Sequence, residues 1–191
     1  MEWLIPIQTF QVENVQLGSI LHGNKPLVPF AYKDGDMHFN SLSFLLPILT
    51  IKSYDMATGR LVLSLQGSTQ ALNKMTTFQD ILLSTVVANQ QSWYPGNARR
   101  PQDIRAGYQS MIQNSEIHLY CPVSDTGSTI PFYADGEWSK HGIQHERLQS
   151  GANVRVALRI QGLSFHIHTG TGQWTGKFRL QHKIIAVLLT G

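Results

Sequence analysis

The feature that most constrains this chain is a pair of long alternating segments in its last third, residues 153–168 and 176–189. Successive side chains of a β-strand point to opposite faces of the sheet. In both segments one set of alternate positions is apolar, whereas the other carries cations. The pattern predicts two strands that share one core face and one cationic face. The cations of that face are Arg155, Arg159, Lys177, Arg179 and Lys183.

The first of these segments changes parity at Gln161 and Gly162. Its apolar residues are even-numbered as far as Ile160 and odd-numbered from Leu163 onward. A β-bulge inserts one residue into a strand and bends it, and glycine often marks the position. We therefore predict a bulge at Gly162 in one bent strand, with two separate strands joined there as the alternative. Long bent strands turn the corners of small barrels.

The first 67 residues have the pattern of short strands separated by turns. Residues 33–36 carry one turn signal. Residues 55–59 form a five-residue loop in which Gly59 is placed to close a hairpin. The expected strands are residues 4–10, 15–21, 27–32, 44–54 and 60–66.

The central part of the chain changes to a helical pattern. Ser68 is a candidate N-cap, and residues 69–91 contain no glycine or proline and place apolar side chains along one stripe. Pro101 opens a second helix that is expected to extend to about Met111. Strands resume at residues 116–121 and 129–134, and a polar loop follows at 138–151.

Together these elements predict an α+β fold, namely an antiparallel, OB-like β-barrel with extra N-terminal strands and a central helical insert. A chain of 191 residues is of a suitable length for one domain. Within that domain, residues 1–67 would form the N-terminal strands, 68–113 the helical insert and 114–191 the C-terminal strands.

Composition narrows the class of protein. Charged residues make up 14% of the chain, below the roughly 25% of an average soluble domain, so part of the surface is expected to contact other protein. The net charge of +3 matters only where it is clustered. A single cysteine, Cys121, cannot form an internal disulfide. The N-terminus lacks the pattern of a signal peptide, and no apolar run approaches the roughly 20 residues that span a bilayer. We expect an intracellular protein of the cytoplasm or nucleus with no membrane partner.

The sign of the cationic face favours a polyanion as its ligand. No aspartate or glutamate follows Glu146 in the sequence, whereas a face that is merely solvated usually mixes both signs. Each phosphate that the face neutralised would add about 0.7 to the salt dependence of binding to a single strand. A solvated outer face of a sheet is the alternative interpretation.

Aromatic side chains beside the basic strands could stack on unpaired bases. Trp174 is the first candidate because it lies in a turn rich in glycine and threonine, and Trp138 and Trp93 follow. Arg99 and Arg100, close to Trp93 in the sequence, form a second candidate contact.

The sequence offers little sign of catalysis. It contains no phosphate-binding loop, zinc-protease motif or serine-hydrolase motif, and Cys121 has no neighbour that would lower the pKa of its thiol. The pairs His166/His168 and His141/His145 have spacings found in metal sites, but no third ligand accompanies either pair. We expect a protein that is not an enzyme and that holds neither a metal nor a cofactor.

The closing forty residues resemble a known family. The alternating run from Val154 to Ile160, then Gly-Leu-Ser-Phe, a glycine-rich turn, and the run from Trp174 to Val187 are similar to the end of single-stranded-DNA-binding proteins of large DNA viruses. In that family two long strands and the turn between them complete an OB-type barrel. The resemblance implies binding through the five strand cations with Trp174 nearby, in a virus-infected host cell. The extra strands and helices of this chain depart from a minimal OB fold.

The sequence therefore predicts non-catalytic, largely sequence-independent binding of single-stranded nucleic acid, with DNA expected rather than RNA. One alternative is a viral structural or assembly protein, such as a jelly-roll-like capsid or scaffold subunit that forms homo-oligomers. Another is an adaptor that binds a protein partner through exposed strand edges.

Overall fold

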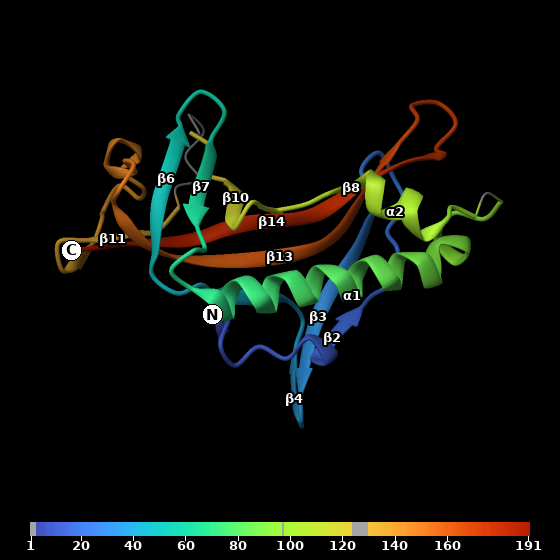
Figure 1. The fold of residues 1–191 in the computed structure, drawn as a ribbon, viewed down its shortest axis with the longest axis horizontal. Helices are drawn as coiled ribbons and strands as arrows, with labels where there is room; N and C mark the ends of the chain where they lie inside the picture. The colour runs from blue at the N-terminus through green and yellow to red at the C-terminus, as the bar shows by residue number, and fades with distance from the viewer. Residues whose placement is uncertain (1–2, 97, 124–129) are drawn as a thin grey trace.

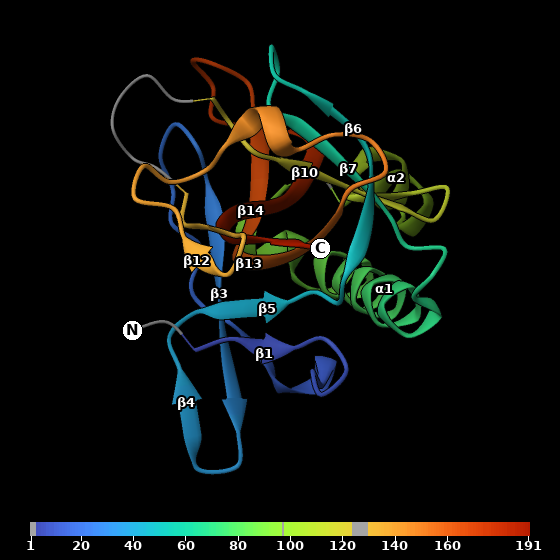
Figure 2. The ribbon, with the colours of Figure 1, turned by 90° about the vertical axis from the view of Figure 1, so that its left-hand side faces the viewer.

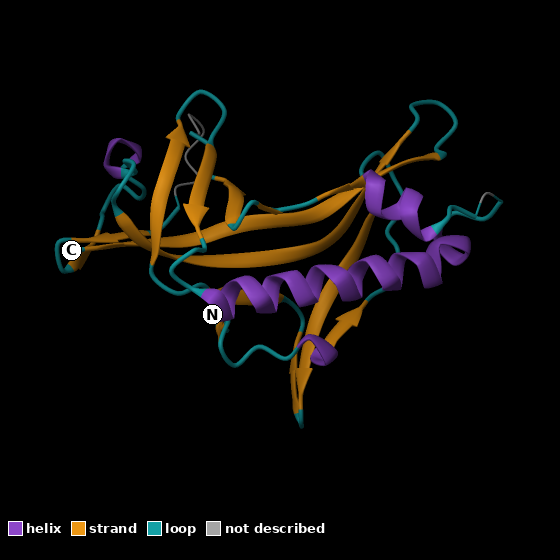
Figure 3. Ribbon diagram, viewed as in Figure 1, coloured by secondary structure: helices purple, strands orange, loops and turns teal. Residues whose placement is uncertain are grey.

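The computed structural model describes residues 3–96, 98–123 and 130–191, which form a large β-sheet and two α-helices (Figure 3). The helices are α1 (Thr69–Trp93) and α2 (Pro101–Gly107), and single 3-10 turns lie at Val12–Asn14 and His145–Arg147. The strands are β1 (Ile5–Pro6), β2 (Val15–Leu17), β3 (Leu27–Asp34), β4 (Met37–Phe39), β5 (Leu42–Leu45), β6 (Leu49–Asp55), β7 (Arg60–Ser64), β8 (Tyr108–Gln109), β9 (Ile112–Gln113), β10 (Glu116–Tyr120), β11 (Phe132–Ala134), β12 (Glu137–Trp138), β13 (Asn153–Ile167) and β14 (Trp174–Thr190).

The hairpin of β13 and β14 runs along the length of the molecule and organises the sheet (Figure 1). On the side that does not face β14, β13 pairs in succession with β6, β5 and β3. On the side that does not face β13, β14 pairs with β11 at one end and with β8 at the other. Both of these β14 pairings are parallel, and so is that of β1 with β5. The sheet is therefore mixed and open, which corrects the expectation of a purely antiparallel one.

The predicted bulge at Gly162 is confirmed. The ladder between β13 and β14 shifts register between Ile160 and Gly162, so that Gln161 is the inserted residue. Gly162 has a φ of 153°, and a Cβ atom on it would lie 2.0 Å from the carbonyl oxygen of Val28. Glycine is thus required because β3 packs against the bend, a reason that parity alone does not reveal. A second shift leaves Ile185 without a partner, and the alternation in the sequence did not indicate it.

Helix α1 covers one face of the sheet and matches the prediction to within two residues (Figure 2). Phe78 packs edge-on against Phe10, Phe30 and Phe44, which brings the helix, β3 and β5 into one cluster. The Ser68 side chain makes no capping hydrogen bond. No helix in the described ranges combines the length and apolar character needed to cross a bilayer.

Several predicted boundaries were wrong. Helix α2 ends at Gly107 rather than near Met111, because the next two residues pair with β14. The segment 44–54 is divided into β5 and β6 around Pro47, and the first two N-terminal strands are shorter than expected. The strand predicted at 129–134 begins at Phe132, while Thr129 lies outside the described residues.

Two predicted turns are confirmed. The β6–β7 hairpin pairs Asp55 with Arg60, and Gly59 has a φ of 76°. The turn at 33–36 joins β3 to β4 in a hairpin that projects away from the body of the molecule (Figures 1 and 2).

Candidate nucleic-acid interface

The strand cations lie on the face of the β13–β14 hairpin that is opposite the core. Directly paired residues of neighbouring strands project to the same face. Arg159 pairs with Lys183, and Ser164 pairs with Arg179, whereas Leu158 pairs with Ile184 on the buried face. The structure therefore brings the predicted cations of both strands onto one surface.

The five cations differ in exposure. Lys177, Arg179 and Lys183, all on β14, are exposed, and none of them has an ion-pair partner within the described part of the chain. Arg155 is half-buried, and its Nε donates a hydrogen bond to the carbonyl oxygen of Leu46 at 2.9 Å. Arg159 is also half-buried and is engaged by neighbouring groups. The charge most accessible to a ligand is therefore that of β14.

Trp174 and Trp93 do not suit the role of stacking platforms, because both rings are buried. Trp174 is 6% exposed, lies 5.3 Å from Phe165 and 5.7 Å from Tyr94 between ring centroids, and donates its Nε1 hydrogen to the carbonyl oxygen of Lys177. Trp93 packs against the same Phe165 ring. These tryptophans hold the hairpin end of β13 and β14 against α1, and we correct their assignment to a structural role.

Arg99 and Arg100 belong to this end of the molecule rather than to the cationic face. The Arg99 guanidinium carbon lies 5.1 Å from the centroid of the Trp174 ring, and its Nη2 donates to the carbonyl oxygen of Trp174 at 3.0 Å. Arg100 is exposed and forms an ion pair with Asp103 at 3.0 Å, which lowers the pKa of the Asp103 carboxyl. Neither residue presents an unengaged charge next to the β14 cations.

Trp138, in contrast, lies on the cationic face. Arg155 on β13 pairs with Leu188 on β14, which pairs with Tyr133 on β11, which pairs with Trp138 on β12. These four side chains therefore form one row on the same surface. Trp138 is 54% exposed, and its ring meets the Tyr133 ring at 5.3 Å between centroids. The structure therefore places the ring of Trp138 on the same surface as the predicted strand cations.

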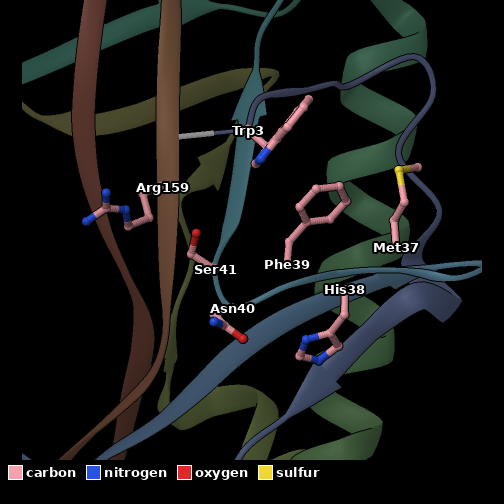
Figure 4. Close-up of a pocket in the computed structure, with 7 residues that line it drawn as sticks. All are labelled: Trp3, Met37, His38, Phe39, Asn40, Ser41 and Arg159. Carbon is pink, nitrogen blue, oxygen red and sulfur yellow. The ribbon is translucent and has the colours of Figure 1, made fainter. Parts of the chain in front are cut away.

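The sequence did not indicate a second pair of rings beside this face. Trp3 is 65% exposed and its centroid lies 5.9 Å from that of Phe39. Both rings line a hollow of about 710 Å³, and Arg159 from β13 contributes to its lining, although its guanidinium points away from the two rings in Figure 4. The remaining lining residues are Met37, His38, Asn40 and Ser41. Trp3 stands in an apolar stretch of sequence, and only its tertiary contact with Phe39 on β4 reveals its position.

Three histidines line a separate pocket of about 500 Å³ at the edge of β14, namely His141, His145 and His182. Burial lowers the pKa of His182 to about 4, and its Nε2 accepts a hydrogen bond from the backbone N–H of Tyr120 at 3.0 Å. Burial also lowers the pKa of His145, which stacks on Tyr54. No group of three or more metal-ligating side chains in the described ranges is arranged to hold a metal ion.

The other histidine pair of the sequence is divided between different surroundings. His166 is exposed, and its Nδ1 donates to the hydroxyl oxygen of Thr175 at 3.1 Å, because that hydroxyl donates its own hydrogen to the carbonyl oxygen of His166 at 3.0 Å. His168 lines a small hollow with Tyr94, Arg99 and Trp174. Cys121 is fully buried, and burial raises the pKa of its thiol to about 11, so the thiol stays protonated at neutral pH.

Comparison of the chain with protein-family models, with curated proteins and with solved structures found no match. The function is therefore inferred from the geometry of the chain's own residues.

Proposed function

We propose that this protein binds single-stranded nucleic acid, without catalysis and largely without regard to sequence. The observation that carries the proposal is the line of Lys177, Arg179 and Lys183, which are exposed on one face of β14 without acidic partners among the described residues. At roughly 3.3 Å per residue, these cations extend along about 20 Å of strand. Such a line suits several consecutive phosphates of one strand.

The exposed rings of Trp138 and Trp3, with the half-buried ring of Phe39, supply the second part of the proposed interface. Trp138 lies in the same cross-strand row as Arg155, and Trp3 and Phe39 share a hollow with Arg159. A strand whose phosphates follow β14 would therefore have rings available near both neighbouring arginines. Stacking of a base on an aromatic ring contributes about 1–3 kcal/mol and tolerates any base.

The OB-type barrel and the preference for DNA belong to this proposal. The bend at Gly162 and the hydrogen bond between Tyr120 on β10 and His182 on β14 curve the open sheet towards the partly open barrel of an OB fold. DNA is proposed rather than RNA because of the resemblance of the closing strands to viral single-stranded-DNA-binding proteins.

Fluorescence anisotropy with labelled single- and double-stranded oligonucleotides, at several salt concentrations, tests the proposal. We expect tighter binding of the single strand and an affinity that falls as salt rises. The double variant Arg179→Glu/Lys183→Glu should lose most of this affinity, whereas Lys25→Glu/Lys33→Glu, with the same change of charge at exposed sites elsewhere, should retain it. Absence of binding at low salt would reject the proposal. Sedimentation of the free protein as large closed shells would favour the assembly alternative instead.

A further inference from the structure

The outer edge of β14 is unpaired over its middle part. It pairs with β8 at Phe178 and Arg179 and with β11 at Val187 and Leu188, and no strand in the described ranges pairs with it between these positions. The pocket of about 500 Å³ lies at this gap. This volume lies within the range of roughly 300–1,000 Å³ that is typical of pockets for small organic ligands.

The pocket combines apolar walls with a few polar groups, as small-molecule sites do. Its apolar lining comes from Pro122, Val123, Ile130, Ile143 and Ile184, and its polar lining from Tyr120, His141, His145, Gln161, His182 and Lys183. Gln161 is the inserted residue of the bulge, so the bend in β13 places an amide at the pocket. No aspartate or glutamate is among these residues, which favours a neutral or anionic ligand.

Hydrogen bonds fix the tautomer of His145. The hydroxyl of Tyr54 donates to the carbonyl oxygen of Cys121 at 2.9 Å, because a carbonyl can only accept. The same hydroxyl lies 2.5 Å from Nδ1 of His145, so Nδ1 must carry the proton that the hydroxyl oxygen accepts. Nε2 of His145 is then an acceptor, and no residue of the described part of the chain donates to it.

His182 contributes differently, because its Nε2 already accepts the backbone N–H of Tyr120. That leaves His145 as a fixed acceptor, Gln161 as both donor and acceptor, and Lys183 as a cation at the same pocket. A flat heterocycle with its own donors and acceptors, carried on an anionic group, matches this set better than a purely apolar ligand does.

We propose that this pocket holds one nucleotide, with the base enclosed by the apolar walls and the phosphate neutralised by Lys183. The proposal deepens the function proposed above and rests on it where the nucleotide is part of a bound strand. Lys183 belongs both to the pocket and to the cationic face. A strand whose phosphates follow β14 would therefore have one base beside the pocket, and a free mononucleotide is the other source of the same chemistry.

Nuclear magnetic resonance of the wild-type protein, labelled with ¹⁵N in the histidine side chains, tests the pocket without any substitution. Addition of the four deoxynucleoside monophosphates should shift the Nε2 signal of His145 while leaving that of the exposed His22 unchanged. Inorganic phosphate serves as the control and should not move the His145 signal. If the base comes from a bound strand, an oligonucleotide should shift the His145 signal, and one with an abasic position should shift it less. If only a free mononucleotide enters the pocket, neither oligonucleotide should shift the signal.

A variant that fills the pocket tests the same idea by affinity. Ile143→Trp should weaken binding of an oligonucleotide roughly tenfold, since one enclosed base is lost, whereas Ile81→Trp on the exposed side of α1 should not change it. If Ile143→Trp does not fold, Gln161→Ala serves in its place. Equal affinity of wild type and pocket variant, together with an unmoved His145 signal for every nucleotide and oligonucleotide, would overturn the pocket. Failure of the strand-binding function is distinct, because the wild type would then bind no oligonucleotide even at low salt.

Discussion

Arg159 on β13 and Lys183 on β14 are direct partners across the hairpin, so two cations face each other on one surface. Like charges in directly opposed positions destabilise a sheet. In the proposed interface, a phosphate bound between the two side chains would accept charge-assisted hydrogen bonds from both and so offset this repulsion.

The first prediction concerns this pair. Lys183→Thr removes the repulsion and introduces a residue with high β propensity, so the free energy of unfolding should rise by up to about 0.5 kcal/mol at low salt. Oligonucleotide affinity should fall in the same variant. Urea denaturation and anisotropy measure the two effects. A variant that is less stable than the wild type at every salt concentration would show that the pair is not repulsive.

The salt dependence of binding reports how many cations meet phosphates. With about 0.7 per phosphate for single strands, the three exposed β14 cations predict a slope of log K against log salt of about −2, and all five cations about −3.5. Lys177→Gln should reduce the magnitude of the slope by about 0.7. A slope near zero would contradict the whole cationic interface.

Gly162 should tolerate no side chain. In Gly162→Ala the added Cβ would meet the carbonyl oxygen of Val28 at 2.0 Å, so we expect a loss of stability of several kcal/mol, about 3 or more. Gly170→Ala is the matched control, because Gly170 also has a positive φ, of 94°, but has open space around it. Its cost should be about 1 kcal/mol. Thermal unfolding of both variants separates the backbone clash from the cost of φ, and equal losses would show that β3 can move away.

His182 should make the stability of the protein depend on pH. Its folded pKa of about 4 lies below the ordinary value of 6.5, because burial and the nearby Arg179 disfavour the charged form. The contribution of neutral His182 to the free energy of unfolding is therefore complete above pH 6.5. This contribution is lost as the pH falls towards 4, by up to about 3 kcal/mol. No aspartate or glutamate lines the pocket, so no carboxylate there would oppose this loss.

Denaturation of the wild type and of His182→Gln at pH 7 and pH 4.5 measures this contribution. Glutamine cannot take up a proton, so the variant should lose less stability between the two values. An identical loss in both proteins would place the pH dependence on other groups.

Trp138 and Trp93 should respond oppositely to substitution. Trp138→Ala removes an exposed ring and should weaken oligonucleotide binding by about 1–3 kcal/mol with little change in stability. Trp93→Ala empties part of the core and should destabilise the protein by about 3–5 kcal/mol. Anisotropy and thermal unfolding of the two variants make the comparison, and unchanged binding by Trp138→Ala would remove this ring from the interface.

Local pattern was enough to predict the long hairpin, the bulge and the first helix. Each of these depends on residues adjacent in the sequence: the alternation around Arg155, the change of parity at Gly162, and the stripe of apolar residues after Ser68. The same alternation also indicated which cations share a face.

The environment of the rings could not be predicted in this way. Trp174 stands in a turn whose composition suggests exposure, yet Tyr94 and Arg99, far away in the sequence, cover its ring. Trp3 is exposed beside Phe39 for an equally non-local reason. The pocket of His145 and Gln161 likewise draws on segments that are distant in the sequence, so its polar groups could not be assembled from spacing alone.

The pairing of β13 with β3, β5 and β6 also has a consequence for how the chain is made. These three strands lie within the first 55 residues, whereas their common partner begins at Asn153. During synthesis β3 and β5 therefore leave the ribosome about a hundred residues before the edge that completes them, while β6 can pair early with β7. Contacts between such distant segments make folding slow. Nascent chains that stop before β13 should hold unpaired apolar strands and depend on chaperones until the hairpin emerges.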